Sequence, residues 1–453
     1  MKKYFILASL FFLFNHSFAQ RKKKAAENIP ADKSLVIQKN LSDSALLDLV
    51  QKQTIKYFWD FAHPVSGMAR ERSNEAYNYG NEVVTTGGTG FGIMALIVGV
   101  ERKWLPRDSV AKRLLKMINF LSKADSYHGV FPHWMNGATG KTIPFSRKDD
   151  GADLVETSYL FEGLLCAREY FNEDNKTEKE IRDRIGWLWN DIEWNWFTRG
   201  GQEILYWHWS PNNGWAMNFP LHGYNETLIT YILAASATNY TVSDKVYHRG
   251  WAMSNFFFNG KKFYGYILPL GFDYGGPLFF AHYSFLGLDP HGLKDEYADY
   301  WEQNQNHTLI NRAYCIDNPK HYKGYSADCW GLTASDSYAG YSAHSPTNDL
   351  GVISPTAALS SFPYTPEYSM QALKHFYFDL GHKIWGPYGF VDAFSESHNW
   401  YAKSYLAIDE GPIVVMIENY RSGLFWKLFM KIPDIQKGLK KLGFQSPNLE
   451  PLK

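Results

Sequence analysis

The chain has 453 residues, and its 46 Lys and Arg side chains are balanced by 46 Asp and Glu side chains. A net charge of zero argues against nucleic acid and against an anionic membrane surface as the partner. Aromatic residues make up 17% of the chain. Aromatic faces are common platforms for sugar rings, although most of these side chains are expected in the core.

The N-terminus predicts an exported protein. Two lysines precede an apolar run, Tyr4–Phe14, and a small-x-small sequence ends at Ala19. These features are typical of a signal peptide over residues 1–19, so we expect the protein in the periplasm or outside the cell. The apolar run is too short to span a membrane, and no later segment has spanning length. Residues 20–42 are polar and Lys-rich, which predicts a disordered linker before one domain, residues 43–453.

The rest of the chain shows helical periodicity in one segment after another. The predicted helices cover residues 43–61, 88–102, 108–124, 153–172, 177–195, 223–237, 244–257, 277–287, 293–306, 353–361, 366–381, 401–419 and 421–433. About a dozen helices separated by long aromatic-rich loops predict an all-α fold, an (α/α)6 toroid. In that fold an inner ring of helices surrounds a cavity and the loops form a cleft at one end. A helical solenoid is the alternative, but no regular repeat supports it.

One glycine-rich stretch, TTGGTGFG at residues 85–92, is the nearest match to a phosphate-binding loop. It lacks the lysine of a P-loop and a convincing preceding strand. We interpret it as the entry to a helix whose backbone packs closely against a neighbour.

The stretch RKDDGADLVETSYLFEG, residues 147–163, carries three carboxylates at positions i, i+4 and i+7. On a helix Asp149, Asp153 and Glu156 would lie on one face that turns apolar further on, which predicts that they point into a pocket. Capping explains an Asp in the first turn but does not explain Glu156. A metal ion, a cationic partner or a shared proton could offset the repulsion between the three charges.

A second acidic signal is Glu226, at the start of the strongly apolar helix predicted over residues 223–237. Apolar surroundings favour the protonated form of a carboxyl group, which is the state that a general acid needs. A capping role in the first helical turn is the alternative interpretation.

Further acids lie near the C-terminus. Asp392 is in an aromatic loop, and Asp409 and Glu410 either line a pocket or cap a helix. Glu418 and Arg421, three residues apart on one helix, are interpreted as a structural pair.

Three loops mix indole and phenol rings with amides and imidazoles, the combination that sugar sites use for stacking and hydrogen bonding. They cover residues 129–140, 205–226 and 341–366. The substrate-binding candidates from the first two loops are His133, Trp134, Trp207, Trp209, Trp215 and Asn225. Asp392 and Glu410 complete this set.

The three cysteines do not form a disulfide framework. Cys166 is predicted to be an inert core residue, whereas Cys315 and Cys329 could pair in an exported protein. No Cys/His pattern has zinc spacing, and we predict neither a cofactor nor a metal.

Several segments together resemble glycoside hydrolase family 144, the glycoamylase-like domain family. They are FWDFAHPVSGMARER (58–72), TTGGTGFGIMAL (85–96), FPHWMNGATGKTIPFSRKDDGADLVETSYL (131–160), YWHWSPNNGWAMN (206–218), GGPLFFAHYSFLGLDP (275–290), SPTAALSSFPYTP (354–366) and IDEGPIVVMIENYRSGLFW (408–426). The resemblance extends from about residue 45 to residue 433. It implies an (α/α)6 barrel and an inverting hydrolase of β-1,2-glucan, acting either within chains or by release of sophorose from chain ends.

Carried over by position, the family's acidic cluster falls on Asp149, Asp153 and Glu156, and its second carboxylate helix carries Glu226. The resemblance implies that Glu226 is the general acid, and Asp153 is our first choice for the base. Many relatives have Gln where this chain has Glu410, which argues against an essential role for that carboxylate. We expect a monomer.

Two other functions fit the same scaffold. A non-catalytic glycan-binding protein would need fewer carboxylates than the three segments supply. A polysaccharide lyase would need a basic cleft for a uronic acid substrate, which the balanced charge and the acidic cluster disfavour.

Overall fold

The structure is a computed structural model that describes residues 36–73 and 81–449. The predicted signal peptide and most of the predicted linker lie outside these residues. From Ile37 onward the chain belongs to one compact unit. The backbone N–H of Gln38 donates a hydrogen bond to the hydroxyl group of Tyr377 over 3.0 Å, so the ordered fold includes the last residues of the predicted linker.

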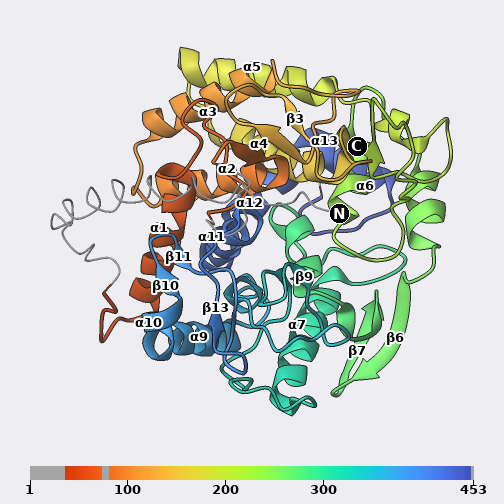
Figure 1. The fold of residues 1–453 in the computed structure, drawn as a ribbon. Helices are drawn as coiled ribbons and strands as arrows, with labels where there is room; N and C mark the ends of the chain where they lie inside the picture. The colour runs from red at the N-terminus through yellow and green to blue at the C-terminus, as the bar shows by residue number, and fades with distance from the viewer. Residues whose placement is uncertain (1–35, 74–80, 450–453) are drawn as a thin grey trace, which may run out of the picture. The chain divides into compact units, whose positions relative to one another are not determined.

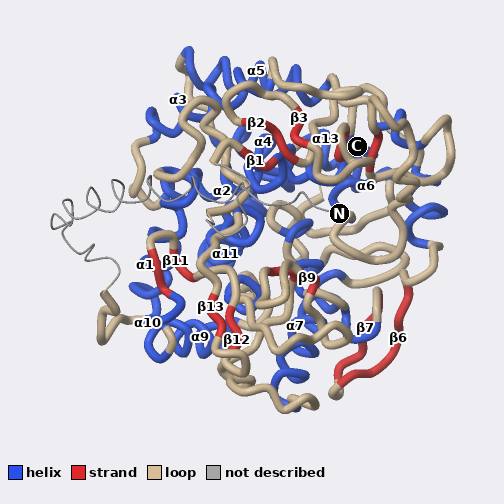
Figure 2. Tube along the Cα trace, in the orientation of Figure 1, coloured by secondary structure: helices blue, strands red, loops and turns tan. Residues whose placement is uncertain are grey.

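Helices are the predominant regular structure of this unit, and short strands lie in the long connections between them (Figures 1 and 2). The α-helices are α1 (Asp43–Trp59), α2 (Thr86–Glu101), α3 (Arg107–Leu121), α4 (Leu154–Tyr170), α5 (Lys176–Asn190), α6 (Leu228–Ser236), α7 (Tyr300–Asp317), α8 (Pro355–Leu359), α9 (Pro366–Lys374), α10 (Gly381–Ile384), α11 (Ala407–Ser422), α12 (Leu424–Met430) and α13 (Pro433–Lys441). The 3₁₀ and π segments are η2 (Trp194–Thr198), η3 (Val246–Ala252), η4 (Asp273–Gly275), η5 (Leu278–Ala281), η6 (Tyr283–Phe285) and η7 (His375–Asp379).

Successive helices alternate between fully and partly buried positions. In α2 every residue from Thr86 to Gly99 is buried. In α5 the buried side chains are Ile181, Ile185, Trp189 and Glu178, which lie three or four positions apart on one face. Helices α2, α4, α6 and α11 therefore form an inner layer, and α1, α3, α5 and α9 lie outside them. Helix α2 packs against both α4 and α11.

Glycines allow α2 and α4 to approach closely. A Cβ atom at Gly163 would collide with the backbone of Gly90, and one at Gly90 would collide with the backbone of Tyr159. The interpretation of the glycine-rich stretch as a close-packed helix entry is therefore confirmed.

All the strand pairs are antiparallel and short. The strands are β1 (Val83–Thr85), β2 (Trp134–Asn136), β3 (Thr142–Ile143), β4 (Ala152–Asp153), β5 (His208–Trp209), β6 (Phe258–Phe263), β7 (Tyr266–Leu270), β8 (Ala334–Ser335), β9 (Ser342–Ala343), β10 (Trp385–Gly386), β11 (Gly389–Phe390), β12 (Phe394–Ser395) and β13 (Trp400–Tyr401). Strands β1, β2 and β3 form one sheet, and β4 pairs with β5 beside the start of α4.

Some helix predictions were wrong in extent or type. The helix predicted over 293–306 begins only at Tyr300, because the Asp299 side chain caps it by accepting from the N–H groups of Trp301 and Glu302. It then runs on to Asp317. The segments predicted at 244–257 and 277–287 form the π-helix η3 and the two 3₁₀ segments η5 and η6.

The pair predicted between Glu418 and Arg421 was also wrong. Glu418 instead binds the Arg102 guanidinium, with an Nε–Oε2 distance of 2.8 Å. Arg421 binds Asp48 over 2.6 Å. Each residue therefore pairs with a side chain from another part of the chain, and the spacing of three residues within one helix does not reveal such partners. Within the described ranges no helix combines the length and the apolar composition needed to cross a bilayer.

Candidate active site

The three carboxylates of the 147–163 stretch come together, but not as one helical stripe. Helix α4 begins at Leu154, so Asp149 lies before it in a turn that bridges to Ser146. Asp153 is the N-cap and Glu156 is in the first turn. The prediction of a single helix face was therefore wrong, whereas Asp149 and Asp153 do lie together beside one histidine, His208.

Asp153 is held by four hydrogen bonds. Its Oδ1 atom accepts from the N–H groups of Val155 and Glu156, at 3.1 and 3.0 Å, and from Trp207 Nε1 at 2.8 Å. Its Oδ2 atom lies 2.9 Å from His133 Nδ1. Burial acts to raise the pKa of Asp153, but the hydrogen bond and charge of His133 outweigh it and hold the pKa below its ordinary value. Asp153 is thus the carboxylate that stays ionised.

His133 carries the matching positive charge. Burial opposes that charge, but the nearby Glu156 and Asp153 carboxylates raise the pKa of the imidazole to about 10. The ring is therefore protonated at neutral pH, and the cationic partner considered for the acidic cluster is a side chain of the chain itself.

Asp149 and Glu156 hold protons more tightly than ordinary carboxylates. Burial raises the pKa of Asp149 to about 7, and the charge of Asp153 adds to the effect. Burial likewise raises the pKa of Glu156 to about 7. Glu156 Oε2 accepts from the N–H of Gly87 over 2.8 Å, an approach that a Cβ atom at position 87 would block.

Glu226 lies in the turn before α6 and remains partly exposed. Its carbonyl group accepts from Ser284 Oγ over 2.7 Å, which anchors the turn to η6. Burial of the carboxyl group, together with the charge of Glu156, raises its pKa to about 7. The carboxyl groups of Glu226 and Glu156, which belong to different helical segments, therefore interact electrostatically.

Aromatic rings connect Glu226 to the C-terminal acids. The ring of Tyr159 packs against that of Tyr283, with centroids 5.6 Å apart, and its hydroxyl group lies 3.5 Å from the Glu226 carbonyl oxygen. The hydroxyl group of Tyr283 lies 3.5 Å from Asp409 Oδ1. This row of rings extends from α4 to α11.

The C-terminal acids form a second buried cluster. Asp392 Oδ2 accepts from the N–H of Asp336 over 2.7 Å, and Asp336 pairs with Arg72 at 3.0 Å. Burial raises the pKa of Asp392 to about 7 and that of Asp409 well above its ordinary value. The charge of Asp392 also acts to raise the pKa of Asp409, so the two carboxyl groups disfavour each other's ionisation. Burial also raises the pKa of Glu410 far above its usual range.

The aromatic candidates divide into two groups. Trp134 lies beside His133, with ring centroids 5.6 Å apart, and Trp207 binds Asp153. Trp209 instead contacts Tyr127, His128 and Trp196, because it follows His208 on β5 and points to the opposite face. Trp215 contacts Trp196, Phe197 and Tyr206. Contact of these rings with a sugar stays a prediction.

Asn225 has a local structural role next to Glu226. Its side-chain oxygen accepts from the N–H of Thr227 at 3.1 Å and from the Thr227 hydroxyl group at 2.7 Å. These bonds fix the turn that presents Glu226.

Sequence reasoning missed His208. Its Nε2 atom lies 3.4 Å from Asp149 Oδ2 and 3.8 Å from Asp153 Oδ2. Burial lowers the pKa of this imidazole, so a neutral histidine faces the ionised pair of His133 and Asp153. The available signal was its place in YWHW beside two candidate tryptophans, but the pairing of His208 with Asp153 on β4 and β5 is a long-range contact.

His133, Asp149 and Asp153 also offer ligand atoms within 4.8 Å of one another. Asp153 already binds His133 and caps α4, Asp149 lies against His208, and the group contains no thiolate. The expectation that this site needs no metal stays a prediction.

The chain is similar to several known proteins. The Glycoamylase family model, described as a putative glucoamylase, matches residues 218–433. A crystal structure of a Bacteroides uniformis protein described in the same words is 63% identical. The alignment covers 91% of this chain and 100% of that one, with a TM-score of 0.89. The endo-β-1,2-glucanase of Chitinophaga pinensis, solved with sophorotriose and glucose, is 58% identical over 90% of this chain and 100% of that one, with a TM-score of 0.88.

A curated relative from Parabacteroides distasonis is an exo β-1,2-glucooligosaccharide sophorohydrolase acting at the non-reducing end. It is 46% identical over 423 residues, which are 89% of this chain and 58% of the relative. The chain thus spans little more than half the length of that protein. The alternation of inner and outer helices and the match to these structures confirm the (α/α)6 fold. The chain belongs to the glycoamylase-like family, glycoside hydrolase family 144.

Proposed function

We propose that the chain hydrolyses β-1,2-linked glucan by an inverting general acid/base reaction. The observation that carries the proposal is that two carboxyl groups, those of Glu226 and Asp153, have pKa values shifted in opposite directions. Glu226 has its pKa raised to about 7, whereas His133 holds the pKa of Asp153 below its ordinary value. Groups whose environments separate their pKa values in this way are suited to be the acid and the base of one reaction.

In the proposed reaction Glu226 donates its proton to the glycosidic oxygen as the bond from that oxygen to the anomeric carbon breaks. A water molecule attacks the anomeric carbon from the opposite face and gives its proton to the base. Asp153 is our candidate base. The proton reaches Asp153 directly or through a bridging water or substrate hydroxyl group, and one of the four hydrogen bonds to its oxygens is lost as the proton arrives.

The two named enzymes among the relatives support the substrate class, since both names specify β-1,2-linked glucose chains. One acts within chains and the other at an end, so either mode is consistent with this family. The proposal includes export by the predicted signal peptide and action as a monomer.

The test is incubation of the purified chain with linear β-1,2-glucan, followed by chromatography of the products. Short saturated oligosaccharides support the proposal, and the size series at early times distinguishes internal cleavage from sophorose release. Products that absorb in the ultraviolet would indicate a lyase, and binding without products would indicate a glycan-binding protein. Either result would overturn the proposal.

A further inference from the structure

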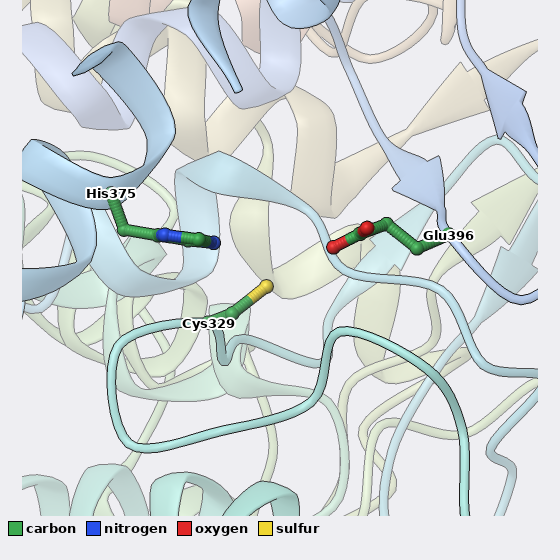
Figure 3. A group of neighbouring side chains, drawn as sticks. All are labelled: Cys329, His375 and Glu396. Atoms are coloured by element: carbon green, nitrogen blue, oxygen red, sulfur yellow. The ribbon is translucent and has the colours of Figure 1, made fainter. Parts of the chain in front are cut away.

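Three metal-binding side chains meet outside the acidic cluster. Cys329 lies in the long loop after α7, His375 begins η7, and Glu396 follows β12. Each offers one ligand atom, and these atoms lie within 4.8 Å of one another. Figure 3 shows the thiol, the imidazole and the carboxylate pointing toward a common point from three separate segments.

His375 is held in an orientation suited to a ligand. Its Nδ1 atom lies 2.9 Å from Asp379 Oδ2, one turn further along η7. This contact leaves Nε2 for the common point. A carboxylate on the far nitrogen is the usual outer support of a metal-bound histidine, and it fixes both the ring and its tautomer. His375 and Asp379 span the π-helix η7, a form that often marks functional sites.

The other two side chains are also available as ligands. Cys329 is fully buried. Across the described part of the chain, neither the Glu396 carboxylate nor the Cys329 thiol has a hydrogen bond or ion pair with another side chain. Glu396 packs against Gly324, whose missing side chain leaves room for the carboxylate because a Cβ atom there would lie 2.5 Å from Oε1.

One thiolate, one imidazole and one carboxylate form a ligand set that suits Zn²⁺. Zinc binds sulfur at about 2.3 Å and nitrogen or oxygen at about 2.0 to 2.2 Å, so tetrahedral ligand atoms lie roughly 3.3 to 3.8 Å apart. The observed group needs to contract by only about 1 Å to reach that geometry. The sulfur ligand disfavours Ca²⁺ and Mg²⁺, which prefer oxygen.

We propose that Cys329, His375 and Glu396 bind one Zn²⁺ ion, with a water molecule as the fourth ligand. Binding releases the thiol proton of Cys329 to solvent. The ion links the loop after α7, the π-helix η7 and the hairpin of β12 and β13. That hairpin follows Asp392, so the zinc stabilises the segment that carries this member of the second acidic cluster.

The test uses the purified full chain after removal of metal by a chelator. Titration with Zn²⁺ should reach one equivalent per chain and raise the melting temperature. Titration with Co²⁺ should produce tetrahedral d–d bands and a thiolate-to-cobalt charge-transfer band. Cys329→Ser should remove the charge-transfer band, and Asp379→Asn should weaken zinc binding by about 10- to 100-fold. Asp379 is exposed, so this second variant should fold even if Cys329→Ser does not.

Two matched variants are the controls. Cys315→Ser changes the neighbouring thiol and should keep the cobalt spectrum, and His382→Ala changes an exposed histidine on α10 and should keep the zinc affinity. Three results would overturn the proposal. One is a charge-transfer band that survives in Cys329→Ser, and another is metal binding lost in Asp149→Asn but retained in Cys329→Ser. The third is a Cys315–Cys329 disulfide in the purified protein, detected as two missing thiols.

Discussion

The Asp153 carboxylate and the His133 imidazole form a buried pair, with 2.9 Å between Oδ2 and Nδ1. The pair has two consequences. It keeps a negative charge at neutral pH, where the neighbouring Asp149 and Glu156 are only partly ionised because their pKa values are both about 7. It also places that charge at the N-terminus of α4, where the helix dipole favours an anion. The same residue is thus both a helix cap and our candidate base.

We predict that Asp153→Asn lowers the turnover number at least about a hundredfold and the free energy of unfolding by about 3 kcal/mol. Asparagine still caps a helix, but it removes the negative charge that faces His133, so the pKa of His133 should fall. Kinetics, chemical denaturation and an NMR titration of the imidazole measure the three effects.

The matched control for this variant is Asp299→Asn, which changes the N-cap of α7 with the same two backbone contacts. It should leave the turnover number unchanged. If Asp153→Asn kept normal turnover despite a lower His133 pKa, Asp153 would be a cap only.

Glu226→Gln should lower the turnover number by about a hundredfold to ten-thousandfold, because glutamine has no proton to give to the leaving oxygen. The melting temperature should stay near that of the parent, since the neutral carboxyl group of Glu226 resembles the side-chain amide of glutamine in size and polarity. The exposed Glu367→Gln on α9 is the control. Near-normal hydrolysis by a folded Glu226→Gln variant would exclude Glu226 as the acid.

The pH dependence of kcat/KM follows from the same groups. Glu226 must be protonated to act, and its pKa is about 7, so activity should fall as the pH rises through about 7. The acidic limb should reflect a carboxylate whose pKa lies below its ordinary value, as found for Asp153. Asp149, Glu156 and Glu226 all have pKa values of about 7 and belong to one interacting cluster. The alkaline limb therefore reports an apparent pKa for the cluster.

Glu156→Gln tests this assignment of the alkaline limb. The charge of Glu156 raises the pKa of Glu226, and its removal should therefore move the limb to lower pH. A limb that stayed in place, in a variant with residual activity, would show that the titrating acid is not Glu226.

The contact between α2 and α4 predicts opposite effects for two glycine substitutions. Gly163→Ala adds a methyl group against the backbone of Gly90 and should destabilise the fold by about 3 kcal/mol. Gly186→Ala in α5 has nothing within 4 Å of the added carbon and should stabilise it by about 0.4 to 1 kcal/mol. Denaturant unfolding of both variants measures the difference. Equal stability would mean that the helices can separate at little cost.

The sequence was sufficient to predict helices wherever burial is periodic or complete, as in α2, α4 and α5. It was insufficient where a long-range contact decides the local structure. Asp149 does not share a helix face with Glu156 because β4 pairs with β5 just before α4, and His208 reaches Asp153 through that same pairing. The ion pair of Glu418 with Arg102, in place of the predicted pair with Arg421, is likewise a contact between distant segments. Residue types near a site can be recognised in a sequence, but partners on other segments cannot be read from local spacing.

The last prediction concerns stereochemistry. If Glu226 protonates the leaving oxygen while a carboxylate activates water on the opposite face, each cleavage inverts the anomeric carbon. A β-linkage should therefore yield an α-anomer first, which the anomeric proton signal in NMR identifies before mutarotation mixes the two forms. Asp153 is suited to activate water rather than to attack the sugar, because its two oxygens are engaged by the cap, Trp207 and His133. A β-anomer as the first product would require a carboxylate nucleophile with a free oxygen. Asp153 would then be excluded as that nucleophile, and Asp149 and Glu156 would be the remaining candidates in the cluster.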